Sequence, residues 1–184
     1  MKIREKVIDI LCKTATGDRK VRNFLTPVGL IIFLGFIVLI IFLALTADRL
    51  LGLPRFWFQS WCRIISVPII IMGLFMALWS ILYFFRVKGT PVPFNPPPRL
   101  VMTGPYAYVR NPMLTGVFTM LFGLGVYSRS LSLLFVFTPL FIIFNYWELK
   151  MIEEPELQKR LGKAYMEYKS RTPMFIPHIK KQTK

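Results

Sequence analysis

Four uncharged stretches constrain what this chain of 184 residues can fold into. They cover residues 27–47, 64–85, 111–128 and 130–147. A hydrocarbon core of about 30 Å needs about 20 apolar residues per helix, so the first two stretches span it comfortably and the last two are short. A tight polar turn, residues 128–130, joins the last two and predicts a helical hairpin with two short legs. The sequence predicts an all-α integral membrane protein with four transmembrane helices, and five is the alternative count.

The composition indicates a lipid partner rather than a nucleic acid. The chain carries 24 Lys and Arg against 9 Asp and Glu, a formal net charge of +15. A soluble nucleic-acid-binding protein can carry that charge, but 54% of these residues are hydrophobic and only 18% are charged. Soluble domains have about a quarter of their residues charged. We therefore expect the bilayer, and no nucleic acid, as the partner of this chain.

The basic residues are distributed unevenly around the four stretches. Segment 1–23 holds seven, segment 86–110 four and the tail 148–184 nine, whereas segment 48–63 holds three and the hairpin turn one. Cytoplasmic loops of membrane proteins carry an excess of Lys and Arg. Four spans therefore place 20 of the 24 basic residues in the cytoplasm if both termini lie there. We expect a multi-pass protein with both termini cytoplasmic.

The first segment precedes the first apolar stretch. Residues 1–13 place Ile3, Val7, Ile10 and Leu11 at helical spacing among basic residues, which favours a short interfacial helix. A solvated basic arm is the alternative. The first apolar stretch is longer than a usual signal-peptide core and lacks a small-residue cleavage site, so no cleavable signal is expected.

Thiol and imidazole groups are too few for a structural metal site. Cys12 and Cys62 are 50 residues apart, and His178 is the single histidine. A zinc site needs about four such ligands. We expect two free thiols and no metal.

Proline and turn residues fill the segment before the hairpin. Five prolines lie within residues 91–98, and proline fixes φ and removes backbone donors, so this loop should be extended. Turn signals follow at residues 104–106 and 110–112. Asn111 before Pro112 predicts a helix N-cap with proline at the first helical position. Amides at such an entrance suit an anionic or polar ligand.

Acidic residues gather just beyond the last apolar stretch, in an otherwise basic protein. Carboxylates at that boundary suggest a cationic ligand, and a solvated helix start is the alternative. The following tail is amphipathic, which predicts a helix with one face on an apolar surface. The residues concerned are the acidic Glu148, Glu153, Glu154 and Glu156 and the apolar Leu157, Leu161, Tyr165 and Tyr168.

Two blocks of sequence resemble a known family. Residues 104–116, GPYAYVRNPMLTG, resemble the signature of the isoprenylcysteine carboxyl methyltransferases and the related phospholipid methyltransferases. The second block matches in order and spacing, and the resemblance covers roughly residues 86–177. That block consists of Glu153-Glu154, Leu157, Leu161-Gly162, Tyr165, Tyr168, Arg171-Thr172-Pro173 and Phe175-Ile176-Pro177.

The resemblance implies an S-adenosylmethionine-dependent methyltransferase that releases S-adenosylhomocysteine and uses no metal. Its cofactor pocket would lie at the cytoplasmic membrane face, closed by the tail helix, and a lipophilic or prenylated acceptor would enter from the membrane. Glu153 and Glu154 would bind the cofactor's ammonium group. Arg110 and Arg171 would face its carboxylate or an acidic acceptor. Cofactor contacts carried over from the family fall on Pro98, Arg99, Leu100, Val101, Gly104, Tyr106, Asn111, Pro112, Met113, Leu114, Glu153 and Glu154.

The chain divides into three parts of one membrane domain, 1–184. Residues 1–23 form the basic arm, residues 24–85 contain the first two transmembrane helices, and residues 86–177 form the cofactor-binding core.

Three positions depart from the family pattern. Asn111 stands where the family usually has histidine, and Leu114 stands where it has tyrosine. Leu149 stands where the isoprenylcysteine enzymes have an arginine that faces the substrate carboxylate. A bidentate carboxylate clamp needs a guanidinium, so a different lipophilic acceptor is an open alternative.

The alternatives are a phospholipid N-methyltransferase-like enzyme, an NADPH-dependent enzyme of the sterol-reductase kind and a non-enzymatic membrane scaffold. An NADPH 2′-phosphate pocket would need clustered arginines, and the sequence disperses them. A scaffold would leave the proline-rich loop and the glutamate pair unexplained.

Overall fold

The computed structural model describes residues 3–55, 58–87, 90 and 100–177, and these residues form helices and no strands. The all-α prediction is confirmed. In chain order the elements are α1 (Ile3–Thr16), α2 (Arg19–Leu50), α3 (Gln59–Arg86), the 3₁₀ turn η1 (Gly104–Ala107), α4 (Pro112–Ser128), the π-turn η2 (Leu133–Phe137), α5 (Thr138–Glu148), the π-turn η3 (Leu149–Glu153), α6 (Glu154–Leu161) and α7 (Lys163–Arg171).

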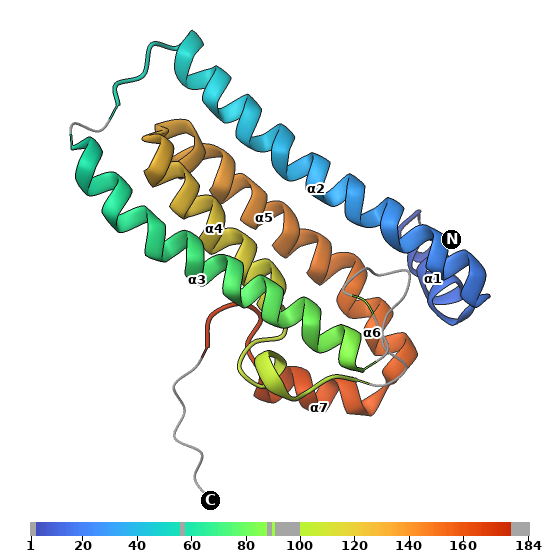
Figure 1. Ribbon diagram of the computed structural model, residues 1–184. Helices are drawn as coiled ribbons and strands as arrows, with labels where there is room; N and C mark the ends of the chain where they lie inside the picture. Colours follow the sequence, from blue (N-terminus) through green and yellow to red (C-terminus); the bar gives the residue numbers. More distant parts are fainter. Residues whose placement is uncertain (1–2, 56–57, 88–89, 91–99, 178–184) are drawn as a thin grey trace, which may run out of the picture.

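Four apolar helices, α2 to α5, run side by side (Figure 1). Helical residues Lys20–Leu50, Gln59–Arg86 and Leu133–Leu161 are long and apolar enough to cross a membrane, and α4 is a shorter apolar helix. Most side chains of α2 and α3 point outward, and many of these are large and hydrophobic. Such a surface is suited to lipid rather than water.

The predicted hairpin has one long leg instead of two short ones. Its first leg is α4, but the second continues through α5 and α6 as far as Leu161. The prediction ended this leg where the uncharged stretch ends, although a charged residue such as Glu148 does not terminate a helix. The helix instead changes its hydrogen-bond pattern, in the π-turns η2 and η3.

Each π-turn is followed within two residues by a proline, Pro139 or Pro155. Proline has no N–H, so it cannot bond the carbonyl four residues before it. A π-turn supplies i→i−5 bonds instead, and the amide of Glu154 donates to the carbonyl of Leu149. The two prolines therefore explain where the backbone hydrogen-bond pattern of the helix changes.

The amphipathic tail forms two helices rather than the single helix that was predicted. Gly162, with φ of +59°, separates α6 from α7. This left-handed conformation is open to glycine and costly for other residues. The predicted apolar face remains recognisable, because Tyr165 and Tyr168 are buried after the break.

Small residues bring α3 and α4 into backbone contact, and Gly73 and Ala77 on α3 have the four-residue spacing that permits it. A Cβ added to Gly73 would lie 2.6 Å from the carbonyl oxygen of Gly116, and one added to Gly116 would lie 2.6 Å from the amide nitrogen of Ala77. Gly123 makes a similar approach to Ile70. Helices in lipid associate through such close packing because lipid tails are as apolar as the helix surface.

The core lies between α2, α4 and the long last helix. Phe118 of α4 packs edge-on against Phe141 of α5 and against Phe175 of the chain end, with ring centroids 5.7 and 5.2 Å apart. The buried core side chains are Ile37, Ile40, Ala44, Leu114, Val117, Phe118, Leu121, Leu133, Phe141 and Leu149.

The contact between α3 and α4 yields a stability prediction. Gly73→Ala should lower the melting temperature by roughly 4–10 °C, because overpacking costs about 1–3 kcal/mol and backbone atoms cannot rotate away. The measurement is thermal unfolding in detergent. Gly35→Ala is the control, since a Cβ on Gly35 would meet no atom within 4 Å. Equal melting temperatures for the two variants would contradict the predicted clash.

Candidate active site

The predicted signature segment is fixed between α3 and α7. The Tyr168 hydroxyl of α7 donates a hydrogen bond of 2.7 Å to the carbonyl of Tyr106 in η1. The Tyr106 ring packs edge-on against Phe84, with centroids 4.8 Å apart. Gly104 has φ of +62°, and a Cβ there would lie 2.5 Å from the ring of Tyr83. The segment therefore needs glycine at this position to approach α3.

A buried ion-pair cluster joins the signature segment to both tail helices. Arg110 Nη1 lies 2.5 Å from Glu154 Oε1 and donates to the Tyr165 hydroxyl over 3.2 Å. Lys169 Nζ of α7 lies 2.5 Å from Glu154 Oε2. The side chains of Arg110 and Glu154 are only 11% and 7% exposed. The two carboxylate oxygens of Glu154 thus each face a cation of the protein itself.

Glu153, the neighbour of Glu154, has a different environment. It is half-buried, and no hydrogen bond or ion pair joins it to another residue in the described part of the chain. Glu153 lies near Tyr106: burial raises the pKa of Tyr106 above its ordinary value, and Tyr168 and Glu153 raise it further. Tyr106 therefore remains a neutral phenol near Glu153.

Arg110 also has an unused donor. Its Nε is buried and has no hydrogen-bond partner within the described ranges. A buried N–H without an acceptor costs about 1–3 kcal/mol, and such a group needs an explanation in the function of the site. Together, Arg110 and Glu153 offer one donor and one acceptor at the same end of the helices.

Helix α1 braces the turn that carries Glu153. Pro155 has no N–H to offer the carbonyl of Met151, and Arg4 Nε of α1 donates to this carbonyl over 2.8 Å. The predicted helix at the N-terminus is confirmed, and it packs against η3 and α6. Asp9 and Lys159 form a further contact between α1 and α6, with an Oδ1–Nζ distance of 2.5 Å.

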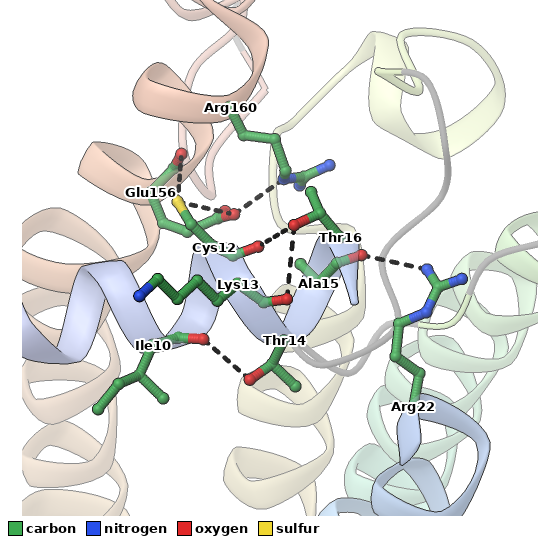
Figure 2. A network of polar contacts seen from close by, with 9 residues as sticks. All are labelled: Ile10, Cys12, Lys13, Thr14, Ala15, Thr16, Arg22, Glu156 and Arg160. Carbon is green, nitrogen blue, oxygen red and sulfur yellow. Dashed lines mark hydrogen bonds and ion pairs between the residues drawn. The ribbon is translucent and has the colours of Figure 1, made fainter. Parts of the chain in front are cut away.

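Figure 2 shows the packing of α1 against α6 around Cys12. Its thiol faces Glu156 of α6, with the sulfur 3.7 Å from Oε1, and Arg160 bonds to that carboxylate at 2.8 Å. Burial raises the pKa of the Cys12 thiol, and the Glu156 carboxylate raises it further. Cys12 is therefore a neutral thiol that packs α1 onto α6. Both cysteines are free, as predicted.

Two amides just before the first residue of α4 already have partners. Asn111 occupies the predicted N-cap position, with Pro112 first in the helix, but its side chain makes no capping bond. The amides of Arg110 and Asn111 donate to the carbonyls of Pro173 and Met174, over 2.8 and 3.1 Å. These two amides hold the chain end in place, so they are not available to the anionic ligand that was expected here.

The remaining predicted positions have varied surroundings. Leu100 and Val101 are half-buried ahead of η1, while Met113 and Leu114 pack in the core. Arg171 is exposed at the end of α7 and has no polar contact with another described residue. Pro98, Arg99 and the rest of the predicted extended loop 91–99 lie outside the described residues.

Leu149 is buried in the hydrophobic core. Its side chain is 2% exposed and belongs to the hydrophobic core with Leu114 and Phe118. Leu149, which departs from the family pattern, is thus a packing residue in this structure.

Sequence reasoning missed Lys169 and Arg4 as part of the site. Each contacts a residue 15 or more positions away, and no local pattern signals such a contact. Tyr165 was recognised as part of an apolar face, but its hydroxyl contact with Arg110 was not foreseen.

The two glutamates should differ in their contribution to stability. Glu154→Gln removes the charge that two cations face, and breaking such a buried pair costs about 3 kcal/mol, or roughly 6–12 °C in melting temperature. Glu153→Gln, the same change one residue earlier, should lower the melting temperature far less. An equal loss in both variants, measured by thermal unfolding, would refute this assignment of partners.

Removal of the Arg4 guanidinium should loosen α1. Arg4→Ala leaves the Met151 carbonyl without its donor, at a cost of about 1 kcal/mol, so amides of α1 should exchange roughly fivefold faster. Hydrogen exchange measures this. Lys6→Ala, an exposed change on the same helix, should leave exchange unchanged. Identical exchange in both variants would show that Arg4 does not hold the helix.

Comparisons with known proteins agree with the signature segment. A family model described as phospholipid methyltransferase matches residues 47–164, well over half of the chain. The nickel-cobalt-cadmium resistance protein NccN of Alcaligenes xylosoxydans xylosoxydans is 28% identical over 127 residues, which cover 67% of this chain and 55% of that protein. The chain thus spans about half the length of this relative. No solved structure matches this chain. The family match includes Arg110, Glu153 and Glu154, and the chain belongs to the phospholipid methyltransferase family.

Proposed function

We propose that this chain is an S-adenosylmethionine-dependent methyltransferase that acts on a lipophilic acceptor at the cytoplasmic face of the membrane. Family membership implies a methyltransferase of the lipid or isoprenylcysteine kind. The observation that carries the finer proposal is the combination of Glu153, which makes no hydrogen bond or ion pair with a described residue, with the buried Nε of Arg110, which has no hydrogen-bond partner there.

These two groups fit the amino-acid end of S-adenosylmethionine. That end carries an ammonium and a carboxylate, which need an acceptor and a donor. Glu153 would accept from the ammonium, while Arg110 would donate to the carboxylate. Glu154 is less suited than we expected from the sequence, because Arg110 and Lys169 already neutralise it. Arg171 is exposed and is a weaker candidate than Arg110.

The bound cofactor supplies a methyl group that is already activated on a sulfonium. The protein then needs mainly to position donor and acceptor and to exclude water, which accounts for a site without a nucleophilic triad. The buried Tyr106 and Tyr168 support the wall of the site through the bond between them. Arg110 and Lys169 hold α6 and α7 against the signature segment, through Glu154.

The acceptor we favour has no carboxylate that must be clamped at position 149. Leu149 lies within the aliphatic core, so a carboxylate there would lose its hydration without gaining a cation. The family description supports a lipid acceptor instead. The positive-inside pattern supports a cytoplasmic site, since the site lies at the end of the bundle where α1 packs against η3 and α6.

Cofactor titration tests this proposal. S-adenosylmethionine should bind the detergent-solubilised wild type, and Glu153→Gln should weaken binding about tenfold to a hundredfold, because a charge-assisted hydrogen bond contributes roughly 1.5–3 kcal/mol. Isothermal calorimetry gives the dissociation constants. Glu167→Gln, at an exposed glutamate of α7, is the matched control and should bind as the wild type does.

Two results would count against the proposal. Binding of NADPH without binding of S-adenosylmethionine would favour a reductase. Unchanged cofactor affinity in a folded Glu153→Gln variant would remove Glu153 from the site.

A further inference from the structure

A polar cavity lies at the opposite end of the helices from the candidate active site. It has a volume of about 310 Å³ and lies between the end of α2 and the turn that joins α4 to η2. Figure 1 shows these two segments at the end of the bundle remote from α1, α6 and α7. Its charged lining residues are Asp48, Arg49, Arg55 and Arg129. The lining thus holds three arginines and one aspartate.

The Asp48 carboxylate is hydrogen-bonded to the turn that joins α4 to η2. Asp48 Oδ1 accepts a hydrogen bond of 3.0 Å from the amide of Ser132, and the hydroxyls of Ser130 and Ser132 also bond to it. No ion pair within 4 Å joins Arg49 or Arg55 to a carboxylate in the described part of the chain. Asp48 therefore fastens α2 to the turn, and the cavity retains an excess of positive charge.

Helices α2 and α4 end in the same hydrogen-bonded motif, in which one residue takes a left-handed conformation that glycine usually provides. At the end of α2, the amides of Gly52 and Leu53 bond to the carbonyls of Arg49 and Asp48, and Gly52 has φ of +59°. At the end of α4, the amides of Arg129 and Ser130 bond to the carbonyls of Val126 and Gly125.

The left-handed position at the end of α4 is Arg129 itself, with φ of +57° and ψ of +35°. It is the one residue other than glycine with positive φ in the part of the chain that the structure describes. A left-handed conformation is costly for a residue with a Cβ. The chain thus keeps an arginine where glycine would be less strained, and this arginine lines the cavity.

We propose that this cavity binds a phosphate group. Guanidinium groups bind phosphate oxygens through paired hydrogen bonds, and three arginines beside one hydrogen-bonded carboxylate leave a net positive charge at the cavity. The cavity lies where the apolar stretch of α2 ends at Asp48, and lipid headgroups would meet a membrane-spanning helix at such an end. The phosphate of an anionic lipid and a free phosphate share this chemistry. The site is separate from the proposed methyl-transfer site and does not depend on it.

Thermal unfolding in dodecyl maltoside micelles tests the proposal. Dioleoylphosphatidic acid and dioleoylglycerol, which differ in the phosphate, are added at equal mole fraction, and inorganic phosphate at constant ionic strength forms the third arm. The phosphatidic acid should raise the melting temperature of the wild type by about 5 °C relative to dioleoylglycerol. An equal rise with inorganic phosphate would identify a soluble phosphate as sufficient.

Arg129→Gly separates binding from folding. It removes the guanidinium and relieves the strained backbone, so the variant should remain folded without phosphate, yet lose most of the phosphate-dependent rise. Arg63→Gln, an exposed arginine near the start of α3 that does not line the cavity, should keep the full rise. An Arg129→Gly variant that responds as the wild type does would overturn the proposal, as would a wild type that responds to neither phosphate source.

Discussion

The ion pairs of the buried Glu154 carboxylate are the interactions on which the candidate-site end of this structure depends. A carboxylate that is 7% exposed needs compensation for its lost hydration, and Arg110 and Lys169 provide it from two other segments. Three pieces of chain that are distant in sequence are thereby tied at one point. The bonds from Arg110 and Asn111 to the chain end, and from Tyr168 to Tyr106, then enclose the same region.

Much of the fold could be predicted because lipid imposes simple rules on sequence. Uncharged stretches indicated the apolar helices, and the polar turn at residues 128–130 indicated the hairpin of the last two. The π-turns that interrupt the last helix were harder to predict from the sequence. Pro139 and Pro155 allow either a kink or a π-turn, and packing determines which one forms. Gly162 was visible in the sequence, but a glycine inside an amphipathic pattern does not by itself require a break.

The candidate site was predicted in part for a similar reason. The signature segment and the glutamate pair were recognised by resemblance, and the structure brings Arg110 and Glu154 together. The different surroundings of Glu153 and Glu154 could not be foreseen, because adjacent residues of a helix point in different directions and only their distant neighbours distinguish them. Lys169 and Arg4 approach the site from other helices, and such contacts leave no local trace in a sequence.

The π-turn at residues 149–153 has a consequence for the alignment of related chains. A π-turn holds one residue more than the α-helical turn it replaces, while the helix on either side keeps its direction. A relative with one residue fewer between Phe141 and Glu153 would therefore place its glutamate at the same point in space, on an uninterrupted α-helix. Related chains can thus differ by one residue between the apolar core and this glutamate. A single-residue gap in an alignment at this turn does not mean that the glutamate has moved away from the candidate site.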